Sequence, residues 1–114
     1  PTALEMMLGT LLGGWVSEGF VSEGRAGFNN TDLEYFQYVL DAYDALVGGR
    51  RYVSRRALRR SGKTIHELDV QDLTHLRDSP LAPLVGLKAA DKPIPEIVWQ
   101  GGPGLKRAFL MALF

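Results

Sequence analysis

The sequence predicts an α+β fold with the element order α-β-β-α-β-β-α. Three observations indicate it: two helix-capping motifs, apolar residues at helical spacing after them, and glycine turns between short alternating segments. The chain has 114 residues, which is long enough for one domain with one core. Its 46% hydrophobic and 23% charged residues are typical of a globular domain, so we expect a single unit over residues 1–114.

Two long helices are expected in the first half of the chain. Thr2 and Glu5 form a capping box before an apolar segment, which predicts a helix over residues 3–17. A second capping box over residues 31–34 begins another helix, which the glycine pair at 48–49 ends.

Two hairpins are expected beside these helices. The first joins residues 20–22 to residues 25–28, and the second joins residues 51–58 to residues 64–70. Glycine lies in each connecting turn, where its freedom to adopt positive φ favours a tight reversal.

The last third of the chain is predicted to be mostly helical. Residues 72–76 and 81–85 indicate two short helical pieces, and residues 93–95 are expected to be extended. A loop over residues 101–104 then leads into a final helix over residues 105–114.

A near-repeat at the two ends of the chain has an offset of 99 positions. It aligns Gly9 with Ala108 and Gly13 with Ala112. Each pair of small residues lies on one helical face, where two backbones can approach closely. Because a helical glycine costs about 1 kcal/mol relative to alanine, we expect a partner helix to need this space. The partner is either the other copy within the chain, a second chain, or a complementary second half.

The distribution of charge is more informative than the net charge, which is zero. Seven of the 13 basic residues lie within residues 50–63, whereas residues 28–49 contain four acids and no lysine or arginine. A basic segment on a hairpin favours contact with DNA over a merely solvated strand face.

Strand alternation divides these basic residues between two faces. One face would carry Arg51, Arg55 and Arg59, and the other would carry Arg56 and Arg60 with Tyr52 and Ser54. The sequence leaves open which face contacts DNA. It also leaves Arg25 and Asn29 open between DNA contact and an ordinary turn. The candidate DNA-binding residues are Arg25, Asn29, Arg51, Tyr52, Ser54, Arg55, Arg56, Arg59, Arg60 and Lys63.

Several site types are excluded or disfavoured. The chain has no cysteine, which excludes disulfides and thiolate metal sites. His66 and His75 have no convincing partners for a hydrolytic triad, and Trp99 is expected to serve in packing. The apolar segments at both ends are too short to span a bilayer, and neither is typical of a signal peptide.

Residues 11–19, which read LLGGWVSEG, resemble the LAGLIDADG signature of homing endonucleases, which are free-standing or embedded in inteins. Gly13, Glu18 and Gly19 match its small-residue and acid-glycine positions. Residues 110–114 resemble the opening of a second copy of the signature.

Two further elements extend the resemblance to essentially the whole chain. Residues 92–95 resemble the Lys-x-Ile-Pro element of intein endonucleases, and residues 28–32 resemble the segment between their first hairpin and its following helix. The chain is particularly similar to endonuclease domains of actinobacterial inteins inserted in DNA gyrase A.

The resemblance implies a fold and a mechanism. Two signature helices pack along a pseudo-two-fold axis beneath a saddle-shaped antiparallel sheet that binds double-stranded DNA. Acids at the ends of these helices hold Mg²⁺ at the scissile phosphates, a role suited to carboxylate oxygens. Glu18 would be a catalytic metal ligand and Lys92 the catalytic lysine. The resemblance also implies a bacterial cytoplasmic protein that is associated with the nucleoid when it is bound to DNA.

The sequence also departs from the family pattern. The last acid of the signature is most often Asp, although Glu occurs in the intein branch, and the second acid would lie three positions beyond Phe114. We therefore expect a half-domain that ends inside its second signature helix, with an incomplete active site. The alternative is a non-catalytic DNA-binding or structural module left from a decayed or truncated endonuclease.

Overall fold

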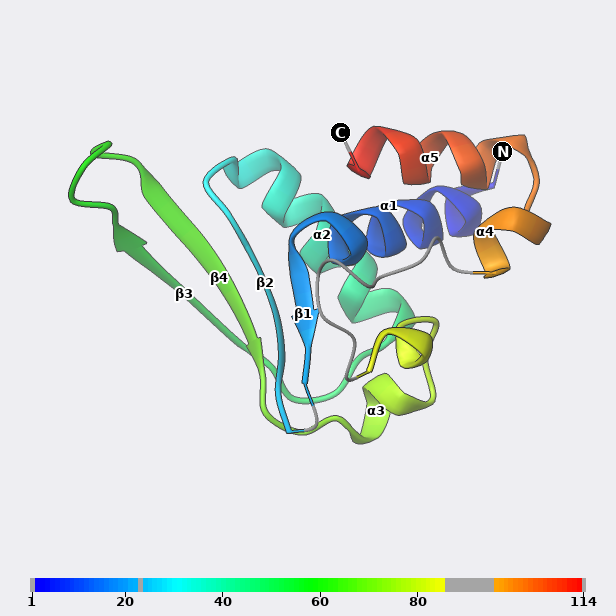
Figure 1. Cartoon of the computed structure of the whole chain (residues 1–114), viewed down its shortest axis with the longest axis horizontal. Helices are drawn as coiled ribbons and strands as arrows, with labels where there is room; N and C mark the ends of the chain where they lie inside the picture. The colour runs from blue at the N-terminus through cyan, green and yellow to red at the C-terminus, as the bar shows by residue number, and fades with distance from the viewer. Residues whose placement is uncertain (1, 23, 86–95, 114) are drawn as a thin grey trace.

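The computed structural model describes residues 2–22, 24–85 and 96–113 and shows the predicted order of helices and hairpins (Figure 1). Lys92, the rest of the 92–95 element and Phe114 lie outside the described residues. No helix in the described part of the chain is long and apolar enough to cross a membrane. The elements are α1 (Ala3–Glu18), β1 (Gly19–Val21), β2 (Ala26–Asn30), α2 (Leu33–Leu46), β3 (Tyr52–Ala57), β4 (Thr64–Val70), α3 (Thr74–Arg77), a 3₁₀ turn η1 (Ala82–Leu84), α4 (Glu96–Gln100) and α5 (Pro103–Leu113).

The four strands form one antiparallel sheet in the order β1-β2-β4-β3. In the second hairpin, β4 therefore pairs with β2 of the first hairpin, and β3 is an edge strand. Figure 1 shows the β3–β4 hairpin projecting beyond the helices. The α+β class is confirmed as a four-stranded antiparallel open sheet with helices packed against one face.

The core lies between this sheet and helices α1 and α2. Trp15 is fully buried, and its ring stacks on Phe28 of β2 and Tyr43 of α2 at centroid distances of 5.8 and 5.5 Å. Gly19, the residue after α1, has φ −85° and lies against this indole: an added Cβ would lie 2.6 Å from Trp15 Cγ. Glycine at this position therefore permits close packing instead of supplying a left-handed turn.

Both long helices begin near the expected residues, but one cap differs. The Thr2–Glu5 capping box is present. At α2, the cap is Asp32, whose carboxylate accepts a hydrogen bond from the Tyr35 N–H at 3.1 Å. The proposed 31–34 box was wrong, because the Glu34 carboxylate instead accepts a hydrogen bond from the Tyr38 hydroxyl at 3.2 Å.

The strand and helix boundaries differ by a few residues from expectation. Strand β2 continues to Asn30, two residues further than expected. The loop expected over 101–104 is shorter, because α5 begins at Pro103, whose fixed φ suits the first helical position. Helix α4 was not predicted.

Helices α1 and α5 pack side by side in parallel (Figure 1). A Cβ built on Gly9 would lie 2.6 Å from the Ala108 Cβ, and one built on Gly13 would lie 2.7 Å from the Ala112 Cβ. The small residues therefore meet within one chain, as the near-repeat allowed. Self-association through the same four residues would require this contact to open.

Candidate nucleic-acid interface and metal site

The sheet has one face against the helices and one polar face directed away from them. Phe28, Leu68 and Val70 are buried against the helices, so alternation directs Asn29, Glu67 and Asp69 the other way. The strand register then adds the neighbouring side chains of β3. We call this surface the outer face; it comprises Asn29, Tyr52, Ser54, Arg56, Glu67 and Asp69.

The register resolves which residues of β3 share the outer face. Tyr52 lies opposite Asp69 and Ser54 lies opposite Glu67, and Arg56 follows on the same side. Arg55 lies opposite His66 on the other side, but every residue of β3 is exposed, so Arg55 is also accessible.

The alternation of side chains between two faces does not extend to the end of the hairpin. Strand β3 ends at Ala57, and the turn is closed by a hydrogen bond from the Leu58 N–H to the Lys63 carbonyl at 2.8 Å. Gly62 adopts φ +70° in this turn, as a glycine can without strain. Arg59 and Arg60 therefore lie in the loop, and their assignment to opposite strand faces was wrong.

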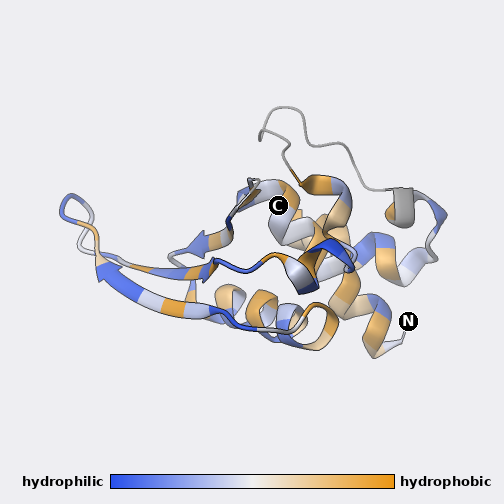
Figure 2. Cartoon of the chain, turned by 90° about the horizontal axis from the view of Figure 1, so that it is seen from below, coloured by the Kyte–Doolittle hydropathy of each residue, from blue (hydrophilic) through white to orange (hydrophobic). Residues whose placement is uncertain are grey.

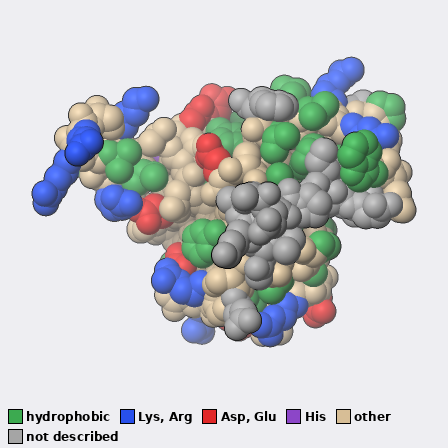
Figure 3. All heavy atoms as spheres, viewed as in Figure 1, with side chains coloured by type: hydrophobic (Ala, Val, Ile, Leu, Met, Phe, Trp, Pro, Cys, Tyr) green, Lys and Arg blue, Asp and Glu red, His purple; other side chains and the backbone are tan. Residues whose placement is uncertain are grey.

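Cationic side chains gather at this projecting end (Figure 3), and the loop between β3 and β4 is largely hydrophilic (Figure 2). Four of them are exposed and form no ion pair with any residue that the structure describes. We call these the free cations: Arg55, Arg59, Arg60 and Lys63.

The remaining three candidate arginines, Arg25, Arg51 and Arg56, are paired with carboxylates. On the outer side of the sheet, Arg25 pairs with Asp69 at 3.0 Å and Arg56 pairs with Glu67 at 2.6 Å.

Arg51 makes a two-point contact with Asp44 of α2, at 3.0 Å from Nε and 2.6 Å from Nη2. This hydrogen bond is the main reason that the Arg51 pKa is raised. Its side chain is therefore held against α2, away from the outer face, and is only 30% exposed, which makes Arg51 a weaker candidate for DNA contact than the exposed arginines.

Glu18 is the last residue of α1, and its carboxylate is exposed. The Asn30 side chain at the end of β2 donates from Nδ2 to Glu18 Oε2. The orientation of that amide follows from its other contact, because Asn30 Oδ1 accepts a hydrogen bond from the Asp32 N–H at 2.7 Å. Asn30 thus links the acid to the start of α2.

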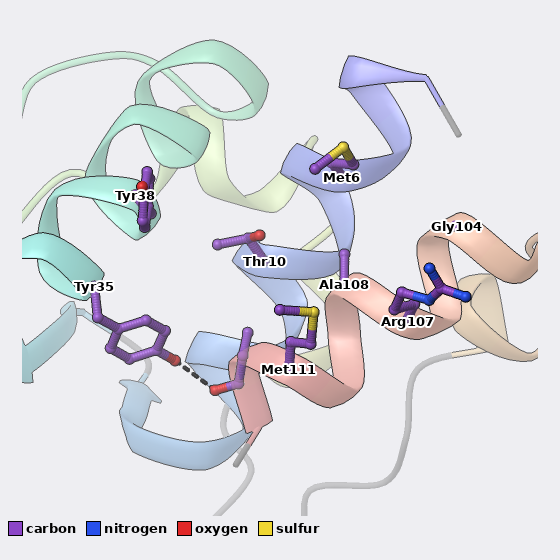
Figure 4. Close-up of a pocket in the computed structure, with 9 residues that line it drawn as sticks. Met6, Thr10, Tyr35, Tyr38, Gly104, Arg107, Ala108 and Met111 are labelled. Carbon is purple, nitrogen blue, oxygen red and sulfur yellow. Dashed lines mark hydrogen bonds between the residues drawn. The ribbon is translucent and has the colours of Figure 1, made fainter.

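Tyr35 lies beside the same helix end. Its pKa is raised mainly by burial; a hydrogen bond with the Ser17 side chain lowers it, and the nearby Glu18 charge raises it. The Tyr35 hydroxyl donates to the Ala112 carbonyl of α5 at 2.6 Å (Figure 4). The C-terminal ends of α1 and α5 are therefore joined through one tyrosine.

The described residues contain no cluster of three or more His, Asp or Glu side chains that could hold a metal ion. Glu18 fits the role of one carboxylate ligand of a Mg²⁺ ion that keeps several waters. Asn30 does not, because its amide presents N–H groups to the carboxylate. The metal-ligand role of Glu18 therefore stays a prediction, as does the catalytic role of Lys92.

The histidines have separate environments. The His66 ring lies 5.6 Å from the Phe36 ring, and His75 lies against Gly49 beyond α2. Trp99 is 60% exposed, so its expected packing role was wrong, because α4 leaves this side chain outside the core.

An apolar groove of about 490 Å³ lies between α1, α2 and α5 (Figure 4). Its edges are open, and Met111 and Tyr38 are 74% and 58% exposed. The lining residues are Met6, Thr10, Tyr35, Tyr38, Gly104, Arg107, Ala108, Met111 and Ala112.

No family model matches the chain. The chain is similar to a short segment of mycobacterial DNA gyrase A. It is 53% identical to the Mycobacterium malmoense protein over 110 residues, which cover 96% of this chain and 23% of that protein. It is 50% identical to the Mycobacterium gordonae protein and 45% identical to the Mycobacterium leprae protein, covering 20% and 8% of them. The chain thus spans less than a quarter of these gyrase A relatives.

Four residues of the candidate site were not found from the sequence. Glu67 and Asp69 lie in a predicted strand, and neither was assigned a functional role from the sequence. Asp69 meets Arg25 because β4 pairs with β2, and Glu67 meets Arg56 through the register of β3 with β4. Asn30 and Tyr35 approach Glu18 only after β2 and α2 are folded. The Asn29-Asn30 pair directly before a helix start was the available signal for Asn30.

Proposed function

We propose that this chain belongs to a site-specific homing endonuclease domain within an intein of DNA gyrase A. The domain would hydrolyse phosphodiester bonds of double-stranded DNA, and this chain would supply a DNA-binding sheet and one catalytic acid. The observation that carries the proposal is the parallel contact of α1 and α5 through Gly9–Ala108 and Gly13–Ala112. The near-repeat thereby becomes a pair of matched helices, with Glu18 at the end of one.

The similarity to gyrase A supports an inserted segment. An insertion would match only a short part of each relative, as the 8% to 23% coverage does. A gyrase A name also gives the chain a DNA-related context.

The β3–β4 hairpin supports DNA binding. A two-stranded ribbon can enter the major groove of a duplex. The free cations lie at its projecting end, where they can neutralise phosphates, and the outer face carries polar side chains that can contact base edges.

Glu18 would hold a Mg²⁺ ion, which supplies charge stabilisation at the phosphate. The chain's own contribution is to position the carboxylate. Asn30 donates to one of its oxygens, and the Asp32 N–H fixes the Asn30 amide in turn. Lys92 would stabilise developing phosphate charge or orient the attacking water, as the resemblance implies.

We propose that a second unit of the same kind covers the apolar groove and supplies the second acid. Leu11 and Leu12 of α1 are fully buried in the core, whereas their counterparts in the repeat, Leu110 and Met111, are 51% and 74% exposed. The outer side of α5 therefore lacks the cover that α1 has. A second copy of this chain would be the other source of such cover.

The alternative is a non-catalytic DNA-binding or structural module. One observation favours it: within the described ranges, Glu18 does not lie in a cluster of three or more acids or histidines that could hold a metal ion. The alternative shares the DNA-binding sheet and differs only in chemistry.

The test is Mg²⁺-dependent nicking of plasmids that carry an uninterrupted mycobacterial gyrase A gene. It compares this chain with a longer protein that includes the proposed second unit. Each of the two proteins is tested in its native form, as the Glu18→Gln variant and as the Glu34→Gln variant. Glu34 is the matched control because it is an exposed acid on α2 whose carboxylate, among the described residues, bonds Tyr38 alone.

We expect the longer protein to cut at one site, Glu18→Gln to abolish cutting, and Glu34→Gln to retain it. Cutting by Glu18→Gln at the native rate would refute the metal-ligand role. Duplex binding without cutting by either protein would establish the non-catalytic alternative.

A further inference from the structure

The two ion pairs on the outer side of the sheet share one arrangement. In each, a carboxylate of the inner strand β4 accepts one or two hydrogen bonds from an arginine of a neighbouring segment. Asp69 Oδ1 accepts from Arg25 Nε at 3.3 Å and Nη2 at 3.0 Å, and Glu67 Oε1 accepts from Arg56 Nε at 2.6 Å.

The arginines project further than the carboxylates that hold them. The Arg25 and Arg56 side chains are 62% and 63% exposed, whereas Asp69 and Glu67 are 29% and 27% exposed. Each guanidinium therefore reaches outward from an acid that lies closer to the sheet.

The contacts use the Nε side of each guanidinium and leave other donors without a partner among the described residues. A guanidinium has five N–H groups, and a guanine contact in the major groove needs two. Toward the described residues, Arg56 keeps both terminal amino groups, and Arg25 keeps Nη1 and one N–H of Nη2. An arginine that is already held in one orientation loses less freedom when it binds a base.

We infer that Asp69 and Glu67 hold Arg25 and Arg56 in place as base-reading residues and so determine sequence specificity. The inference rests on the proposed DNA-binding function. The free cations have no such carboxylate partner among the described residues and supply phosphate affinity instead. Asp69 and Glu67 repel phosphates, so their contribution to affinity for an arbitrary sequence is unfavourable, and their contribution to discrimination is favourable.

The variants Asp69→Asn and Glu67→Gln test this separation of sequence specificity from phosphate affinity, with Asp44→Asn as the matched control. Asp44 also pairs with an arginine, but at α2 and not on the outer face. The probe is a library of random-sequence duplexes, from which each protein selects its preferred sequences. Affinities are then measured for the selected duplex and for the unselected pool, and far-UV circular dichroism checks folding.

We expect each outer-face variant to bind the unselected pool at least as tightly as the native chain. The preference for the selected duplex should fall about fivefold, the lower end of what one arginine–guanine contact contributes. The lost preference should map to the same base pairs that Arg25→Ala and Arg56→Ala affect. Asp44→Asn should leave the preference unchanged.

Two results would overturn the inference while leaving DNA binding intact. One is tighter binding to every duplex with an unchanged preference, which would make the acids simple repellents. The other is salt-sensitive binding by the native chain without any selected sequence. Absence of duplex binding by the native chain would instead remove the proposed function itself.

Discussion

The Tyr35 hydroxyl on α2 donates a hydrogen bond of 2.6 Å to the Ala112 carbonyl on α5. These residues are 77 positions apart, and the bond ties the end of the second matched helix to the element that follows the first hairpin. It lies beside Glu18, whose charge contributes to raising the Tyr35 pKa. The proposed catalytic acid is therefore next to the contact that fixes α5.

Removing this bond should weaken the fold. We expect Tyr35→Phe to lower the free energy of unfolding by about 1 kcal/mol, because a part-buried carbonyl loses its side-chain donor. Urea denaturation measures the change. Tyr38→Phe is the control, and it should have no measurable effect, since in the described part of the chain that exposed hydroxyl bonds only an exposed carboxylate. Equal effects of the two variants would contradict the structural role of Tyr35.

The contact between α1 and α5 should not tolerate a methyl group at Gly9. Its Cβ would lie 2.6 Å from both the Leu105 carbonyl oxygen and the Ala108 Cβ. We expect Gly9→Ala to destabilise the chain by about 1–3 kcal/mol, despite the better helix propensity of alanine. Gly24→Ala, which meets nothing within 4 Å, is the control. A stabilised Gly9→Ala variant would show that α5 does not pack here.

Stability should decline at alkaline pH through Tyr43. Burial is the main cause that raises its pKa from 10.0 to about 12; Asp44 also raises it, and Arg51 lowers it. The unfolded chain releases this proton near pH 10, so stability is intact below pH 10 and is lost as pH rises toward 12. Urea midpoints between about pH 8 and pH 11 should fall less in Tyr43→Phe than in the native chain. Equal falls in the urea midpoints of Tyr43→Phe and the native chain would show that other groups cause the loss of stability.

Asn30 should affect chemistry, whereas its neighbour Asn29 should affect recognition. Asn30 holds the Glu18 carboxylate, and Asn29 lies on the outer face. In the longer protein, we expect Asn30→Ala to lower the Mg²⁺-dependent nicking rate by about tenfold, the lower end for residues that orient metal ligands. A Mg²⁺ titration measures this loss. Asn29→Ala should change target preference with a near-native maximal rate; the reverse pattern would refute both placements.

Local features of the sequence predicted the three longest helices, α1, α2 and α5, to within a few residues. The Thr2 cap and the spacing of Gly9 and Gly13 depend on neighbouring residues within one helix, and both roles are confirmed. The partner of those glycines was left open between this chain and another, because spacing within a helix does not identify what it meets.

Features that depend on distant contacts were predicted less well. Strand alternation grouped Tyr52 with Arg56 correctly but could not show that β4 pairs with β2 as well as with β3. Asp69 was therefore missed as the partner of Arg25. Arg51 was proposed for DNA contact because of its neighbours in sequence, and that role stays a prediction; its ion pair with Asp44 of α2 was missed.

The most direct test of DNA binding by the β3–β4 hairpin is the salt dependence of duplex affinity. It compares this chain with a variant that has alanine at the four free cations, Arg55, Arg59, Arg60 and Lys63. Each phosphate contact contributes about 0.9 to the slope of log affinity against log salt concentration. We expect steep salt dependence in the native chain, and a slope reduced by up to about 3 to 4 in the variant. Arg51→Ala, the matched control, should keep the native slope. Equal slopes for the native chain and the four-cation variant would contradict the assignment of the β3–β4 hairpin to DNA.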